Sequence, residues 1–96
     1  MKVIARPVGT GKTKELLMAA QAADGIVLTS NKRGLQAKAQ AYNIPEVTIV
    51  DWDDLIYGRM DTSRPLFVHK LDDVMKEYFY ADFGLNLEGY SIAMEV

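Results

Sequence analysis

The residues with the clearest chemical meaning are Gly9, Thr10, Gly11, Lys12 and Thr13, near the start of the chain. Glycine adopts backbone angles that other residues avoid and has no Cβ, so a pair of glycines lets backbone N–H groups approach a ligand closely. The lysine ammonium can reach phosphate oxygens, and the threonine hydroxyl can complete the coordination shell of a Mg²⁺ ion held by phosphates and water. This combination of residue types predicts a site for phosphate groups.

The elements predicted on either side of this stretch support the same interpretation. An apolar run at Val3–Ala5 is typical of a buried strand, and the Ala- and Leu-rich segment Lys12–Ala23 is typical of a helix, with Gly25 as its left-handed cap. A helix start offers unpaired N–H groups and the positive end of the helix dipole, and both attract an anion. The alternative is an ordinary helix start that is rich in small residues and lies beside a solvated lysine. The order strand, glycine-rich turn and helix disfavours this alternative.

Here the sequence resembles the P-loop NTPases, whose fingerprint is GxxxxGK[ST]. The chain departs from that fingerprint at its first position, where Arg6 replaces glycine and either changes the mouth of the loop or lies along it as another cation. The resemblance implies that Thr13 binds Mg²⁺ together with the phosphates of ATP. It also implies a set of nucleotide-binding residues: Val8, Gly9, Thr10, Gly11, Lys12, Thr13 and Lys14.

P-loop enzymes also need an acidic residue at the end of a neighbouring strand, where it holds the water shell of Mg²⁺. The segment PLFVHKLDDV, residues 65–74, is similar to the Walker B segment of helicase-like P-loop proteins, but His69 and Lys70 stand at its two acidic positions. A neutral imidazole is a poor Mg²⁺ ligand, and lysine repels the metal. Asp72 and Asp73 follow one helical turn later and are further candidates for the missing acids, while His69 is a candidate for a hydrogen bond to the terminal phosphate.

Asp51 offers another candidate for the Walker B acid. In VTIVDWDDL, residues 47–55, it directly follows four apolar residues that are typical of a strand. The structural alternative is that Asp51 caps a short helix with Asp54 in its first turn, because a carboxylate there accepts hydrogen bonds from helix N–H groups. The apolar pattern alone does not choose between the two Walker B candidates.

The segment GIVLTSNKRGLQAKAQ, residues 25–40, resembles motif Ia of superfamily 1 helicases, where a strand ends in Thr and an Asn-Lys pair begins the next helix. In that family this region contacts the backbone of single-stranded DNA, which makes Lys32 and Arg33 candidate nucleic-acid contacts; a solvated helix face is the alternative. The order of elements is also similar to small P-loop proteins encoded by bacteriophages. A helicase needs two motor domains, and a chain of 96 residues has room for one.

Short apolar runs alternate with segments of helical period, which predicts an α/β fold built on a parallel sheet. The predicted strands are Val3–Ala5, Ile26–Thr29, Val47–Val50, Leu66–Val68 and Tyr90–Met94. The predicted helices are Lys12–Ala23, residues 32–42, residues 51–58 and residues 71–78. The resemblance implies a three-layer P-loop NTPase-like fold, with helices on both faces of a five-stranded, mainly parallel sheet whose strand order is 3–5, 90–94, 66–68, 26–29 and 47–50. We expect residues 1–96 to form a single domain.

The composition, 49% hydrophobic with a net charge of -2 and no cysteine, is that of a small globular protein without disulfides or thiolate metal sites. The charge disfavours nucleic-acid binding by bulk positive charge, and no apolar run approaches the roughly 20 residues that span a bilayer. We therefore expect a cytoplasmic protein, in the host cytoplasm if it is viral. The region Tyr78–Phe83 has more aromatic area than one loop can bury, which predicts a surface for a protein partner or a homo-oligomer.

The function expected from these features is binding of a nucleoside triphosphate, ATP with Mg²⁺, through a Walker A loop. Hydrolysis should be weak or absent, because His69 and Lys70 replace the Walker B acids. One alternative is a small active ATPase that uses Asp51 as its Walker B acid. The other is a non-enzymatic interaction factor, of phage origin, that keeps a relic P-loop.

Overall fold

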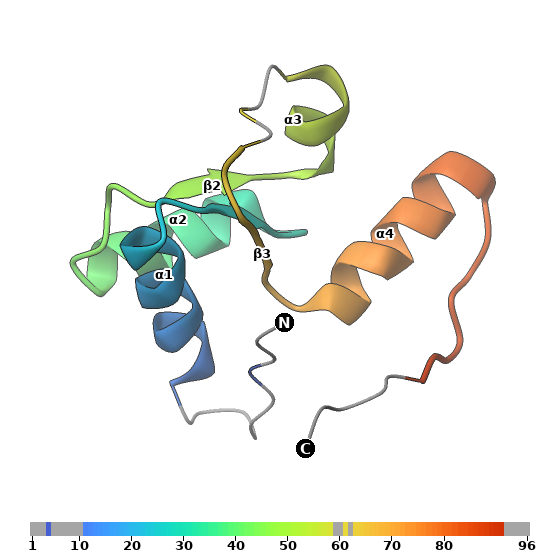
Figure 1. Ribbon diagram of the computed structural model, residues 1–96. Helices are drawn as coiled ribbons and strands as arrows, with labels where there is room; N and C mark the ends of the chain where they lie inside the picture. The colour runs from blue at the N-terminus through green and yellow to red at the C-terminus, as the bar shows by residue number, and fades with distance from the viewer. Residues whose placement is uncertain (1–3, 5–10, 59–60, 62, 92–96) are drawn as a thin grey trace.

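The structure is a computed structural model that describes residues 4, 11–58, 61 and 63–91 (Figure 1). Helices and strands alternate along this part of the chain. In chain order they are α1 (Lys12–Ala22), β1 (Ile26–Leu28), α2 (Lys32–Ala41), β2 (Thr48–Val50), α3 (Trp52–Tyr57), β3 (Leu66–Val68) and α4 (Leu71–Phe83).

The three strands form one parallel sheet in the order β2-β1-β3. Ile26 of β1 pairs with Thr48 on one side and with Leu66 on the other, and the register continues along all three strands. Because the strands are parallel, their carboxyl ends lie at one edge of the sheet. Polar residues that follow these strands are therefore brought to the same side of the molecule.

Helices pack on both faces of this sheet, and successive residues of β1 point to opposite faces. Val27 is fully buried in a core that includes Leu17 of α1 and Leu35 of α2. On the opposite face Ile26 and Leu28 pack with Val50 of β2 and Val74 of α4, while Trp52 and Leu55 of α3 lie against the same cluster. Figure 1 shows α1 and α4 on opposite sides of the strands.

The prediction of a five-stranded P-loop sheet is wrong, because the described residues form an α/β structure with a three-stranded, all-parallel sheet. Its strands do follow the order predicted for these three segments. Ile4, Tyr90 and Ser91 are the described residues of the other two predicted strands, 3–5 and 90–94, and none of them is in a strand. Tyr90 is 62% exposed. A short apolar run shows only that a segment can be buried, whereas a strand also needs a sheet edge to pair with.

The end of α1 differs from the predicted glycine cap. The residue in the left-handed conformation is Asp24, with φ 52°, and not Gly25. Aspartate tolerates this conformation better than most residues with a Cβ. Gly25 is needed for a different reason, since a Cβ at this position would lie 2.7 Å from the ring of Phe67.

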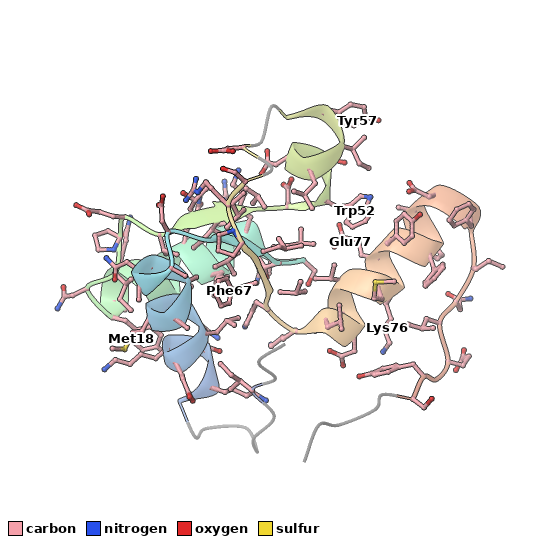
Figure 2. The ribbon with its side chains drawn as sticks, viewed as in Figure 1. Met18, Trp52, Tyr57, Phe67, Lys76 and Glu77 are labelled. Atoms are coloured by element: carbon pink, nitrogen blue, oxygen red, sulfur yellow. The ribbon has the colours of Figure 1, made fainter. Side chains whose placement is uncertain are left out.

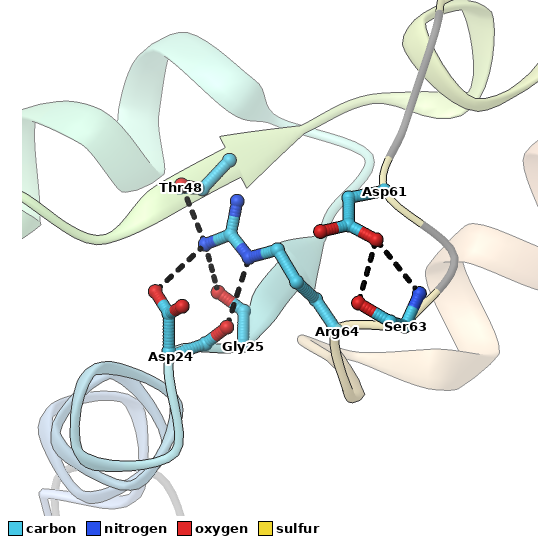
Figure 3. A network of polar contacts seen from close by, with 6 residues as sticks. All are labelled: Asp24, Gly25, Thr48, Asp61, Ser63 and Arg64. Atoms are coloured by element: carbon cyan, nitrogen blue, oxygen red, sulfur yellow. Dashed lines mark hydrogen bonds and ion pairs between the residues drawn. The ribbon is translucent and has the colours of Figure 1, made fainter.

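Arg64 joins the amino ends of all three strands (Figure 3). Its Nε donates to the carbonyl oxygen of Asp24 at 2.9 Å, and its Nη2 donates to the carbonyl oxygen of Gly25 at 3.1 Å. The same Nη2 also donates to the hydroxyl of Thr48 at 3.0 Å. One side chain thus connects the residues just before β1, at the start of β2 and just before β3. It lies at the opposite end of the strands from their carboxyl edge.

Candidate functional site

The described part of the predicted phosphate loop begins at Gly11, and Val8, Gly9 and Thr10 lie outside the described residues, as does Arg6. Gly11 is the N-cap residue of α1 in the left-handed conformation, with φ 80°. A Cβ added there would meet nothing within 4 Å, so the backbone conformation, and not crowding, favours glycine. As a glycine, this N-cap residue has no side chain that could cap the start of α1.

Three polar side chains from separate elements meet at the carboxyl edge of the sheet. Thr13 lies in the first turn of α1, Thr29 follows β1 and His69 follows β3. The imidazole lies between the hydroxyls, with its Nδ1 3.0 Å from Thr29 Oγ1 and its Nε2 3.4 Å from Thr13 Oγ1. The Thr29 hydroxyl oxygen also accepts from the backbone N–H of Asn31, the N-cap residue of α2, at 3.3 Å. We call this group the Thr13–His69–Thr29 cluster.

The environment of His69 favours its neutral form. Its side chain is 8% exposed, and this burial lowers the pKa of the imidazole below its ordinary value. The charges of Lys70, Lys38 and Lys12 lower it further, and of the described residues Asp73 acts in the opposite direction. A neutral ring donates through one nitrogen and accepts through the other, which suits a position between two hydroxyls.

Sequence reasoning noted His69 but missed its contacts. Thr29 was not a candidate residue, although its position at the end of a strand was a usable signal. It is almost fully buried and needs a partner for its hydroxyl. The imidazole supplies one across 40 residues of chain.

Two of the candidate cations have partners outside the cluster. The Lys14 ammonium lies 6.0 Å from the ring centroid of Tyr42. The Lys32 ammonium donates to Asp54 at 2.7 Å, and this hydrogen bond raises the pKa of Lys32. Arg33 is exposed. Lys32 is therefore engaged within the protein at the position where motif Ia would contact DNA.

Asp51 caps the start of α3, which was the structural alternative to its role as a Walker B acid. Its carboxylate accepts from the backbone N–H of Asp54 at 2.8 Å, and the Asp54 carboxylate accepts from the backbone N–H of Asp51 at 3.0 Å. This is a reciprocal capping box at the start of α3. Asp51 also follows β2, which is separated from β3 by β1. The structure therefore places Asp51 and His69 after strands that are not neighbours.

Asp72 and Asp73 lie in the first turn of α4, after Lys70 in the left-handed conformation with φ 55°. Asp73 is exposed and Asp72 is half-buried. Across the described ranges, no three His, Cys, Asp or Glu side chains come together in a group that could hold a metal ion.

The aromatic residues predicted to form a partner surface belong to the last turns of α4 and not to a loop. Tyr78 packs on Trp52, with ring centroids 4.4 Å apart, and Figure 2 shows Trp52 on the side of α3 that faces α4. Tyr80 and Phe83 are 66% and 59% exposed, whereas Tyr78 and Phe79 are half-buried.

The chain matches no protein-family model, no curated protein and no solved structure. Within the part of the chain that the structure describes, no helix has both the length and the apolar character needed to cross a membrane.

Proposed function

We propose that the chain binds a nucleoside triphosphate, with ATP as the first nucleotide to test, and that the phosphates lie at the start of α1. The observation that carries this proposal is the beginning of that helix. Gly11, its N-cap residue, is in a left-handed conformation and has no side chain that could cap the helix, and the sequence around it is GTGKT. Uncapped N–H groups at a helix start are suitable donors to phosphate oxygens.

The proposed contacts are the backbone N–H groups of residues 8–13 and the ammonium of Lys12, as the resemblance to P-loop NTPases implies. The location at the carboxyl edge of a parallel sheet supports this assignment, because ligands of open α/β sheets bind outside that edge. The position of Thr13 beside His69, which follows β3, places the first turn of α1 there.

Isothermal titration calorimetry with ATP tests the proposal, and two lysines of the same helical turn provide a matched pair of variants. Lys12→Ala should weaken binding by about 10- to 100-fold, the equivalent of one charge-assisted hydrogen bond. Lys14→Ala should change the affinity by less than about threefold, because its side chain lies over Tyr42. Equal losses in the two variants, or no binding by the wild type, would contradict the proposal.

We propose that hydrolysis is weak or absent. His69 follows β3 at the position of a Walker B acid, and the carboxylate of Asp51 is held in the capping box of α3. Turnover of ATP by the purified chain should stay close to background. An ATPase activity that Asp51→Ala abolishes and His69→Ala spares would instead favour the small active ATPase.

A second candidate function is protein binding through α4, and the exposure of Tyr80 and Phe83 favours it. Sedimentation velocity over a range of concentrations tests self-association, which Tyr80→Ser together with Phe83→Ser should abolish. A wild type that stays monomeric at high concentration would leave only a different protein as the partner.

With no cysteine in the chain, we propose that the protein acts in the cytoplasm.

A further inference from the structure

We propose that this site takes the triphosphate as a free anion, without Mg²⁺. The inference rests on the proposed function and concerns the chemical form of the ligand. It replaces the expectation that Thr13 would share a Mg²⁺ ion with the phosphates.

The residues at the carboxyl edge of the sheet do not suit Mg²⁺. This ion prefers oxygen ligands in octahedral geometry, and proteins usually supply one or two carboxylates to it or to its water shell. The residues that follow the two strands nearest α1 are Thr29 after β1 and His69 after β3. The Thr13 hydroxyl, the one oxygen that the fingerprint assigns to the metal, faces the Nε2 atom of His69 at 3.4 Å. A nitrogen ligand therefore stands where the metal would need oxygen.

The candidate carboxylates are not arranged to compensate. Asp51 accepts a backbone N–H in its capping box and follows the edge strand on the far side of β1. Asp72 and Asp73 belong to α4, whose core residue Val74 packs on the face of the sheet opposite α1. Bringing the Asp51 carboxylate to Thr13 would require breaking this cap.

The charges around the cluster favour an anion over a dication. Lys12, Lys38 and Lys70 all act on the His69 ring, and they come from three different parts of the fold. Among the residues that the structure describes, Asp73 is the acidic side chain whose charge opposes theirs at this ring. Positive charges that act on this ring favour an anion beside it and repel Mg²⁺.

The decisive measurement is the Kd of ATP for the wild-type chain in EDTA and in excess Mg²⁺, at matched ionic strength. We expect a Kd in EDTA that is equal to or lower than the Kd in Mg²⁺, because the metal neutralises part of the ligand's charge without gaining a protein ligand. Binding that is weaker by about tenfold or more in EDTA would overturn the inference and leave the proposed function intact. No binding in either buffer would overturn the proposed function itself.

Two variants of one position sharpen the test. His69→Asp introduces the missing carboxylate, so ATP binding in EDTA should weaken by about tenfold and Mg²⁺ should restore it. His69→Asn keeps a neutral hydrogen-bonding side chain, and its Kd should remain the same in the two buffers. A folded His69→Asp variant with no Mg²⁺ dependence would contradict the location of the phosphates beside His69. Circular dichroism checks that each variant folds. The comparison of the wild-type Kd in EDTA and in Mg²⁺ does not depend on either variant.

Discussion

Replacement of Arg64 by methionine should lower the free energy of unfolding by about 2 to 3 kcal/mol, through loss of three hydrogen bonds from a charged donor. Methionine keeps much of the apolar stem but has no donor for the carbonyl oxygens of Asp24 and Gly25 or for the Thr48 hydroxyl. Each such bond is worth about 1.5 to 3 kcal/mol when fully buried, and the 25% exposure of the Arg64 side chain lets water replace part of the loss. The sum is therefore smaller than three full bonds.

The ion pair of Arg64 with Asp24 contributes little to this total. The two charged atoms are 3.4 Å apart, but the Asp24 side chain is 91% exposed, and exposed pairs are worth about 0 to 1 kcal/mol. Asp24→Asn is therefore the matched control. Asparagine also tolerates the left-handed conformation of this residue. This variant should change the free energy of unfolding by less than about 0.5 kcal/mol.

Urea unfolding measures both variants, with circular dichroism and the fluorescence of the only tryptophan, Trp52, as independent probes. For a domain of this size, each 1 kcal/mol should correspond to a change of about 4 to 8 °C in Tm. A loss of less than about 0.5 kcal/mol for Arg64→Met, or an equal loss for Asp24→Asn, would refute the view that Arg64 holds the strand ends together through uncharged acceptors.

Three further predictions concern other positions. The pKa of His69 should lie below its ordinary value of 6.5 because burial disfavours the charged ring. The unfolded chain then binds a proton at higher pH than the folded one, so stability should be greatest above pH 6.5 and fall as the pH drops towards the folded pKa. Proton NMR can follow this single histidine directly, and His69→Asn should remove its share of the fall. Gly25→Ala should cost about 1 to 3 kcal/mol through its clash with Phe67, whereas Gly89→Ala, with open space around the added Cβ, should be close to neutral in the same unfolding assay. Asp51→Ala should lower stability by about 1 kcal/mol through loss of the cap while leaving the Kd of ATP unchanged.

The sequence alone determined the features that depend on neighbouring residues. The apolar runs of β1, β2 and β3 and the helices between them follow from local periodicity. For Asp51 the sequence offered a helix cap as one of two interpretations, and the structure shows the cap. The start of α1 after Gly11 also depends on neighbouring residues, because a glycine before a helix-forming segment is a local signal. The GTGKT stretch remains a prediction about phosphate that binding experiments will test.

Only the tertiary structure decided which distant residues meet. Thr13 and His69 are 56 positions apart, and their contact exists because parallel pairing of β1 and β3 brings the residue after β3 to the start of α1. Arg64 lies just before β3 and contacts groups up to 40 positions away. The sheet was also smaller than predicted, because apolar character is a property of a segment whereas strand pairing depends on the available edge of another strand. Such contacts depend on how the whole chain packs, and short sequence patterns do not encode them.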